Sequence, residues 1–455
     1  MMQTIELPIW LFALILLFAT FTALTHLLLP SVRWFFRRRL EKAVARINRR
    51  LTRPINPFKL VKRYDMIQRL IYDPQVAQAI SDHANINEIP ENVAFEQARS
   101  YAREIVPGFS AFAYFGIGIR AARWLATALY NVHTGLQNDE YIRRIPSDAT
   151  VVFVMNHRSN MDYVLVTYLA AQASALSYAV GEWARVWPLS RLIKSMGAYF
   201  VSHKSEGALY RKVLARYVQM ATHAGVTQAV FPEGGLTVDG KLKPLKMGFL
   251  SYILGNYDPN ERDIFFVPVA INYDWVLEDR VLIAASQRGD RRFKAKISVI
   301  MTFTLTKLWE KLSGRFTKFG SAAVVFGEPI SLRAFEPQLQ IEPLAIELEA
   351  RIKDVMPLLP VPLLAKVILS VEGPILQERL VKASREMLPR DHSLLFKENE
   401  ELFYSQMTEA LSQMLSRGMI SDNNDGVIVV DENRDLLQYY ANSLDSSDRV
   451  KVIKV

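Results

Sequence analysis

The sequence predicts an α/β domain that lies between helical regions and follows a membrane anchor. From residue 150 onward, short apolar runs alternate with helical candidates, which is typical of a sheet covered by helices. The flanking regions carry apolar residues mainly at helical intervals. We therefore expect four parts: an anchor at 1–30, a basic helical region at 31–105, an α/β domain at 106–340, and a mostly helical region at 341–455.

The anchor is predicted from its composition and from the position of the charge. Residues 9–29 contain no charged residue and are about as long as a bilayer-spanning helix. Only Glu6 is charged before them, and the basic block at 31–63 follows, so residues from 31 onward should face the cytoplasm. We expect a single N-terminal span in the inner (cytoplasmic) membrane of the cell. The alternative is a buried core helix, since three threonines and a histidine make the run only moderately apolar.

The basic block at 31–63 holds twelve Lys or Arg and one acidic residue, whereas the net charge of the whole chain is +9. A basic stripe with interleaved aromatic residues can bind nucleic-acid phosphates. Its position beside an apolar run favours anionic lipid headgroups instead, which contribute about 1 kcal/mol for each nearby basic residue. We therefore expect membrane lipids, and no nucleic acid, among the partners.

The scarcity of metal-binding residue types limits the chemistry. The chain has no cysteine and seven histidines. The absence of cysteine excludes disulfides, a cysteine nucleophile and thiolate metal sites. Neither an HExxH motif nor another clustered ligand spacing occurs, so we expect no metal site.

The α/β domain is predicted from five short apolar runs. These candidate strands are "VVFVM" (151–155), "LSYAV" (176–180), "AYFV" (198–201), "QAVF" (228–231) and "FFVPVAI" (265–271). Residues 207–225 carry one apolar stripe at helical spacing. The apolar stretch at 109–130 is interrupted by Arg120 and Arg123, which predicts an amphipathic element on the membrane or on the core.

His157 and Asp162 stand five positions apart, directly after the candidate strand at 151–155. Within one helix, this offset would place them about 140° apart. If Ser159 or Asn160 caps a helix that begins near Asp162, the imidazole can fold back onto the carboxylate. An aspartate on one ring nitrogen leaves the other free to remove a proton. The alternative is a capping network without catalysis.

Glu233 follows a second strand and precedes Gly234 and Gly235. Glycines let a ligand approach the backbone, and the lysines at 241, 243 and 246 suit a phosphate. A plain glycine turn with solvated lysines is the alternative. Because ligands gather at the carboxyl edge of such sheets, "GAYFVSHK" (197–204) and "VPVAINYDWV" (267–276) add two more strand ends there.

Together, "NHRSNMD", "GAYFVSHK", "FPEGG" and "VPVAINYD" resemble the four ordered blocks of the glycerolipid acyltransferase family. "HRSNMDY", "EGG" and "LYRKVLARY" are most similar to its glycerol-3-phosphate and dihydroxyacetone-phosphate O-acyltransferase branch. The resemblance implies a mixed sheet flanked by helices. It also implies transfer of a fatty acyl group from acyl-CoA or acyl carrier protein to glycerol 3-phosphate, with no other cofactor.

By the same resemblance, His157 is the general base and Asp162 orients it. Substrate-binding roles are implied for seven further residues, with Glu233 on the glycerol backbone and Arg158 near the acceptor phosphate. The seven are Arg158, Ser159, Lys204, Glu233, Gly234, Gly235 and Lys246.

One departure from the family concerns the acceptor. The family usually has arginines after the block-three glycines, whereas this chain has Leu236, Val238 and Asp239. Lys204, Lys246 or Arg211 compensates, or the acceptor differs. The alternatives are an acyltransferase that acts on 1-acyl-glycerol 3-phosphate or another lipid hydroxyl, and a non-catalytic membrane scaffold with the same fold.

Overall fold

The computed structural model describes residues 8–49, 51, 53–134, 138–170, 175–181, 189–201, 207–289, 318–335, 340–388, 400–423 and 426–444. Two compact units are present, one up to Ile55 and one from Asn56 onward. The first unit contains helix α1 (Ile9–Asn48). The second contains the sheet and all the other helices of the described residues. The four-part division of the sequence stays a prediction.

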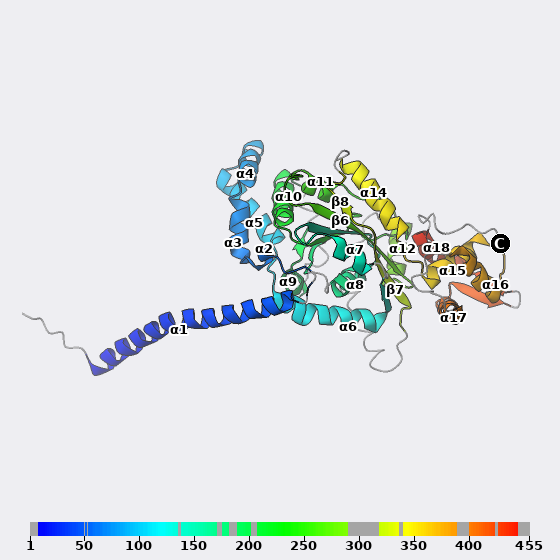
Figure 1. Ribbon diagram of the computed structural model, residues 1–455, viewed down its shortest axis with the longest axis horizontal. Helices are drawn as coiled ribbons and strands as arrows, with labels where there is room; N and C mark the ends of the chain where they lie inside the picture. Colours follow the sequence, from blue (N-terminus) through cyan, green and yellow to red (C-terminus); the bar gives the residue numbers. More distant parts are fainter. Residues whose placement is uncertain are drawn as a thin grey trace, which may run out of the picture. The chain divides into compact units, whose positions relative to one another are not determined.

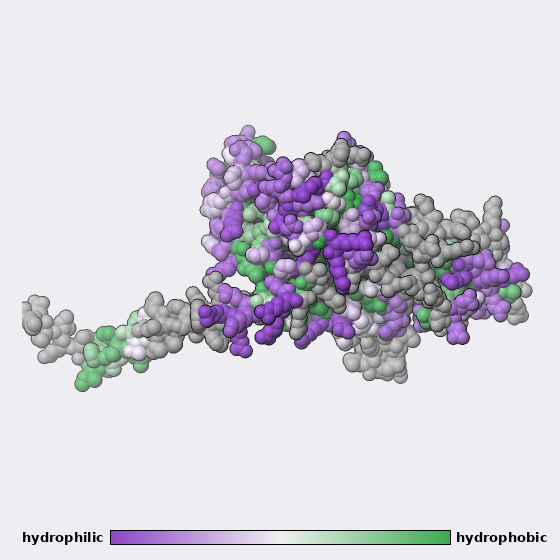
Figure 2. All heavy atoms as spheres, viewed as in Figure 1, coloured by the Kyte–Doolittle hydropathy of each residue, from purple (hydrophilic) through white to green (hydrophobic). Residues whose placement is uncertain are grey.

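Helix α1 includes the predicted anchor. Its first turns expose apolar side chains, which form a green region in Figure 2. The exposed residues are Ile9, Trp10, Phe12, Leu14, Ile15, Leu16, Leu17 and Phe18. Among the described residues, however, no helix combines the length and apolar character needed to cross a membrane. The transmembrane span predicted at 9–29 is therefore unsupported. The side chains of residues 23–30 lie outside the described residues.

The second unit is built on an eight-stranded mixed sheet. Its order is β1 (Asn131–Thr134), β7 (Ser321–Phe326), β6 (Ile264–Tyr273), β2 (Thr150–Met155), β5 (Gln228–Val230), β3 (Ser177–Val180) and β4 (Tyr199–Phe200), with β8 (Ile330–Ser331) also on β6. Strands β6, β2, β5, β3 and β4 are parallel, and β7 and β8 are antiparallel to β6. The five strands predicted from apolar runs are all present, and so is the predicted mixed sheet.

The two faces of the sheet carry separate cores, which strand β2 shows directly. Val151, Phe153 and Met155 belong to one buried cluster, and Val152 and Val154 belong to the other. Alternate side chains of a strand point to opposite faces, so a central strand covered on both sides is a continuous apolar run. This explains why β2 could be recognised as "VVFVM".

Helices from both ends of the chain complete these cores (Figure 1). The Val152 cluster includes α3 (Arg63–Ile71), α4 (Pro74–Ile86), α5 (Glu91–Ile105), α10 (Ala208–His223), α11 (Gly248–Leu254) and α14 (Ile341–Asp354). The Phe153 cluster includes α6 (Ile119–Leu129), α8 (Met161–Ala170), α15 (Pro360–Ser370), α16 (Gln377–Met387), α17 (Glu400–Ser416) and α18 (Arg434–Ala441). The helices after residue 340 thus belong to the same folded unit as the sheet.

The remaining elements are short. They are α2 (Pro57–Leu60), α7 (Asn138–Arg144), α9 (Leu189–Ser195), α12 (Asp279–Gln287), η1 (Phe112–Gly118), η4 (Asp431–Asn433), η5 (Asn442–Leu444) and the hairpin of β9 (Ile420–Asn423) with β10 (Gly426–Val429).

The stretch at 109–130 forms η1 and α6, and it has two different faces. Helix α6 packs on α8 and buries Ala122 and Ala126. On the other side, the side chains of Phe112, Ile117 and Trp124 are at least half exposed, at 71%, 50% and 52%. The predicted contact with the core is confirmed for one face, and the apolar side chains of the other face remain accessible.

Candidate active site

Three parallel strands end at the same edge of the sheet and carry the predicted site residues there. His157 follows β2, Glu233 follows β5, and β6 ends at Tyr273. Beyond β2, the side chain of Asn156 continues the ladder: its Nδ2 donates to the Ile271 carbonyl at 2.9 Å, and its Oδ1 accepts from the Ile271 amide at 2.7 Å. The turn that holds His157 is thereby fixed to β6.

His157 and Asp162 are in contact, as their spacing predicts. His157 Nδ1 lies 2.9 Å from Asp162 Oδ2, and Asp162 is fully buried in the first turn of α8. The same oxygen accepts from the amides of Arg158, at 2.7 Å, and Ser159, at 3.1 Å. Asp162 therefore caps the helix and orients the imidazole at the same time.

Tyr273 is a site residue that the sequence analysis did not identify. Its hydroxyl donates to Asp162 Oδ1 at 2.5 Å. Burial and the Asp162 charge raise the pKa of Tyr273 well above its ordinary value, so the hydroxyl stays protonated as a donor. The available signal was its place at the end of the strand in "VPVAINYD", at the same edge as His157.

Aromatic rings hold the imidazole in place. The His157 ring stacks on Phe231 with centroids 4.2 Å apart, and Tyr163 meets it edge-on at 5.4 Å. A carboxylate can only accept, so Asp162 fixes the proton of neutral His157 on Nδ1. No hydrogen bond is formed to Nε2 within the described part of the chain. This nitrogen is available to take a proton.

Glu233 lies beside His157 and is almost completely buried. Its Oε1 accepts from the His157 amide at 3.2 Å, whereas Oε2 has no partner among the described residues. Burial raises the pKa of Glu233 to about 8, against the opposing effects of the His157 amide and the Lys243 and Arg158 charges. Near neutral pH the carboxyl is largely protonated and can donate a hydrogen bond.

The glycines after Glu233 form an exposed, open part of the site. Gly234 has φ = +72°, and a Cβ there would lie 2.5 Å from Lys246 Nζ. A Cβ on Gly235 would meet nothing within 4 Å. Lys246 thus lies beside Gly234, and its predicted role in substrate binding stays a prediction. Lys243 Nζ donates to the Leu236 carbonyl at 2.7 Å. Lys204 lies outside the described residues.

Arg158 and Ser159 are both buried beside His157, and hydrogen bonds hold each of them. Arg158 is only 2% exposed, its Nη1 donates to the Gly240 carbonyl at 2.8 Å, and its guanidinium lies over the Tyr439 ring. Ser159 Oγ caps α8 by accepting from the Met161 amide at 3.1 Å.

A second buried carboxylate, Glu278, holds the turn in place. It accepts from Ser159 Oγ at 2.8 Å and from Asn160 Nδ2 at 3.0 Å. Burial raises the pKa of Glu278 despite these bonds. Glu278 could not be predicted from the sequence, because it lies after "VPVAINYD" and belongs to no motif.

The loop where family members usually carry arginines turns inward. Leu236 is buried, and the Thr237 amide donates to the His157 carbonyl at 3.0 Å. The Asp239 carboxylate accepts from Thr237 Oγ1 and the Lys241 amide, so it is satisfied within its own turn. These hydrogen bonds hold the Asp239 carboxylate on its own turn, so its repulsion of an anion bound at Gly234 and Gly235 is weaker than its position in the sequence suggests.

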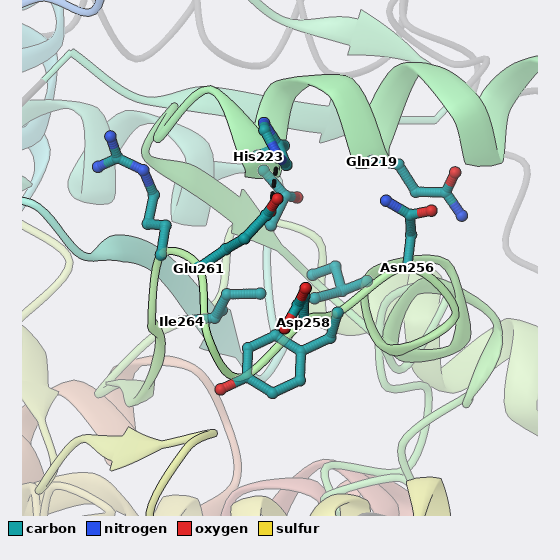
Figure 3. A pocket seen from close by; sticks show the side chains of 10 residues that line it. Gln219, His223, Asn256, Asp258, Glu261 and Ile264 are labelled. Carbon is teal, nitrogen blue, oxygen red and sulfur yellow. Dashed lines mark ion pairs between the residues drawn. The ribbon is translucent and has the colours of Figure 1, made fainter.

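A surface pocket lies at the opposite edge of the sheet (Figure 3). It is lined by residues near the start of β6 and the end of α10, including Ile264, Gln219 and the ion pair of His223 with Glu261 at 2.7 Å. None of the predicted site residues lines it. In the described ranges, no group of three or more His, Asp or Glu side chains is arranged to hold a metal ion.

Comparisons with known proteins show which proteins the chain resembles. Residues 135–272 match a family model described as Acyltransferase. A glycerol-3-phosphate acyltransferase from Pasteurella multocida (strain Pm70) is 28% identical over 281 residues, and one from Ectopseudomonas mendocina (strain ymp) is 31% identical over 285 residues. The matches cover 60% and 61% of this chain and 33% of each relative. The chain thus spans about a third of the length of these curated relatives.

A solved structure also matches. It is the 1-acyl-sn-glycerophosphate (LPA) acyltransferase from Thermotoga maritima, at 21% identity and a TM-score of 0.32. The match covers 51% of this chain and 73% of that one.

Replacing Tyr273 by Phe should lower the turnover number for acyl transfer about tenfold, with both KM values changed less than about twofold. The reason is the loss of a hydrogen bond to a buried carboxylate, worth about 1.5–3 kcal/mol, from the group that orients His157. Steady-state kinetics on the purified protein would measure this. Tyr130→Phe is the matched control, because its buried hydroxyl donates to the Trp275 carbonyl instead. An unchanged turnover number in Tyr273→Phe would contradict the assignment.

Replacing Glu233 by Gln should stabilise the protein at pH 9 by roughly 1–3 kcal/mol and lower its activity. A raised pKa means that the folded state holds a proton that the unfolded state loses, so wild-type stability falls as pH rises from 4.5 to about 8. Gln keeps the Oε1 acceptor and removes this titration. Denaturant unfolding at pH 4.5 and pH 9 would measure both proteins, and an equal difference at the two pH values would refute the prediction.

Proposed function

We propose that the protein acylates glycerol 3-phosphate, because residues 135–272 match a family model described as Acyltransferase and the similar curated proteins are glycerol-3-phosphate acyltransferases. The acyl group comes from a thioester of coenzyme A or acyl carrier protein, and no further cofactor takes part. The product is an early intermediate of phospholipid biosynthesis. The observation that carries this proposal is the His157–Asp162 pair, with Nε2 free at the strand edge.

In the proposed reaction, His157 acts as a general base. Nε2 removes the proton of the acceptor hydroxyl as its oxygen attacks the thioester carbonyl. The carbon–sulfur bond then breaks, an ester forms, and the imidazolium gives its proton to the leaving thiolate, which becomes the free thiol. Asp162 holds the ring in the required tautomer and stabilises the imidazolium, as a carboxylate does in the Ser-His-Asp triad.

Glu233 and the glycine turn are proposed to receive the acceptor. The largely protonated Glu233 carboxyl, with Oε2 unpaired, can hydrogen-bond a glycerol hydroxyl beside His157. Exposed Gly234 and Gly235 let the substrate approach the backbone, and Lys246 supplies a positive charge next to them. This arrangement suits a small polyol that bears a phosphate.

A second candidate acceptor is 1-acyl-glycerol 3-phosphate. Buried Leu236 and partly buried Val238 occupy positions where arginines are usual in the family, which removes two strong phosphate ligands. A lipid acceptor would depend less on its phosphate for binding. A non-catalytic scaffold has no comparable support, because the His157–Asp162 contact is intact.

We also propose that the protein works at the inner membrane with its catalytic unit on the cytoplasmic side. The exposed apolar first turns of α1 are followed by the basic residues of the 31–63 block, a combination that suits an anionic bilayer. The exposed Phe112, Ile117 and Trp124, near Arg120 and Arg123, provide a second apolar and basic surface.

His157→Ala should reduce acyl transfer by about 10²- to 10⁴-fold, the usual contribution of a general base. Labelled acyl-CoA with either glycerol 3-phosphate or its 1-acyl product would measure the reaction and identify the acceptor. His223→Ala, in the pocket at the opposite edge, is the control and should retain full activity. Undiminished transfer by His157→Ala would remove the basis of the mechanism.

Deleting residues 1–30 should reduce sedimentation with uncharged phosphatidylcholine vesicles, and the exposed Phe112, Ile117 and Trp124 should retain some of it. Added phosphatidylglycerol should increase the remaining binding, and high salt should remove that increase, because the basic block remains. A vesicle sedimentation assay on the full and shortened chains would compare them. Equal sedimentation of both chains with uncharged vesicles would contradict a role for the N-terminal apolar segment.

A further inference from the structure

Helix α18, near the C-terminal end of the described chain, packs directly on the loop that follows the glycine turn. Gly240 has φ = +83°, and a Cβ on it would lie 1.9 Å from the Tyr439 carbonyl oxygen. Asn442, just after α18, donates from Nδ2 to the Asp239 carbonyl at 2.7 Å. The backbone of this loop therefore takes its position from α18.

Arg158 depends on the same contact. Its guanidinium lies 5.3 Å from the centre of the Tyr439 ring, and Nη1 donates to the carbonyl of Gly240. A cation over an aromatic face is attracted by the negative charge of that face, more strongly when both groups are desolvated. Tyr439 and Gly240 thus fix the plane of the Arg158 guanidinium from two directions.

The rest of the Arg158 guanidinium has no partner. Nε and Nη2 are buried, and neither forms a hydrogen bond within the described residues. Unsatisfied charged donors are expensive to bury, which suggests that a ligand completes them. The neighbouring Glu233 has an equally unpaired Oε2, and the Arg158 charge lowers its pKa. The unpaired Arg158 donors and the Glu233 carboxyl, which precedes the exposed Gly234, therefore lie close to one another.

Helix α18 is itself firmly held. The Tyr440 hydroxyl donates to Asp279 Oδ2 at 2.6 Å and accepts from the Val276 amide at 3.1 Å. Leu436 and Leu437 are buried in the same core cluster as β6. The helix is thus docked on the segment that follows β6, which also provides Glu278 for the catalytic turn.

We propose that α18 completes the acceptor site and that Tyr439 and Asn442 are positioning residues. Tyr439 presents Arg158 so that Nε and Nη2 bind the phosphate of a glycerol phosphate acceptor. The 236–240 loop cannot supply this contact, because it contains no arginine. Asn442 keeps that loop against α18. The planar guanidinium suits two parallel bonds to a phosphate. This inference rests on the proposed function and adds residues of the last helix to its acceptor site.

The test is a set of variants of the full chain, assayed with varied glycerol 3-phosphate and varied acyl-CoA. Tyr439→Leu removes the ring but keeps an apolar side chain, and it should raise the KM for glycerol 3-phosphate about tenfold. The KM for acyl-CoA should change less than about twofold. Tyr439→Phe keeps the ring, so both KM values should equal those of the wild type. Asn442→Ala should raise the KM for glycerol 3-phosphate several-fold.

Arg434→Ala is the control on the same helix, because its side chain is exposed, and it should match the wild type. If Tyr439→Leu fails to fold, the comparison of Asn442→Ala with Arg434→Ala still decides the outcome. An unchanged acceptor KM, or an equal rise in both KM values, would overturn the role of α18 while leaving the acyltransferase proposal intact. A wild type that acylates neither glycerol 3-phosphate nor its 1-acyl product would instead overturn the proposed function.

Discussion

The site depends on one buried carboxylate. Asp162 accepts hydrogen bonds from the Arg158 and Ser159 amides and the Tyr273 hydroxyl, and it meets His157 Nδ1. Burying an isolated charge would cost several kcal/mol, so these partners must stay in place for the fold to tolerate it. They come from the β2–α8 turn and from β6, so the interaction that orients the base also joins two strands of the sheet.

The meeting of His157 with Asp162 could be predicted, because a five-residue offset brings the two together only across a strand–turn–helix junction. Glu233 could be placed at the same edge, since it directly follows a recognisable strand. Tyr273 and Glu278 could not be identified. Their contacts depend on how β6 pairs with β2, with Met155 opposite Val269, and no local pattern fixes that register.

Contacts between segments far apart in the sequence also could not be predicted. The Arg158 guanidinium lies over the Tyr439 ring of α18, and no local pattern relates these two positions. The predicted span at 9–29 relied on the absence of charge. Among the described residues, no helix meets the requirement for crossing a membrane, so the span stays unsupported.

Two buried side chains, Glu233 and Arg158, lack hydrogen-bond partners for some of their polar atoms in the part of the chain that the structure describes, and so lower the stability of the fold. Within the described residues, Glu233 Oε2 and the Nε and Nη2 groups of Arg158 have no hydrogen-bond partner, which is costly for buried polar groups. The two extensive cores on either side of the sheet can offset that cost. Both groups lie next to the turn that carries His157, which is the expected arrangement if they await an acceptor that bears hydroxyl and phosphate groups.

The central claim is that His157 and Asp162 act as one catalytic unit. A double-mutant cycle with His157→Ala, Asp162→Ala and the combined variant, measured by single-turnover acyl transfer, tests it most directly. If Asp162 acts only through His157, the double variant should be no slower than His157→Ala alone. Additive losses, with the double variant slower by the product of the two single effects, would contradict the account.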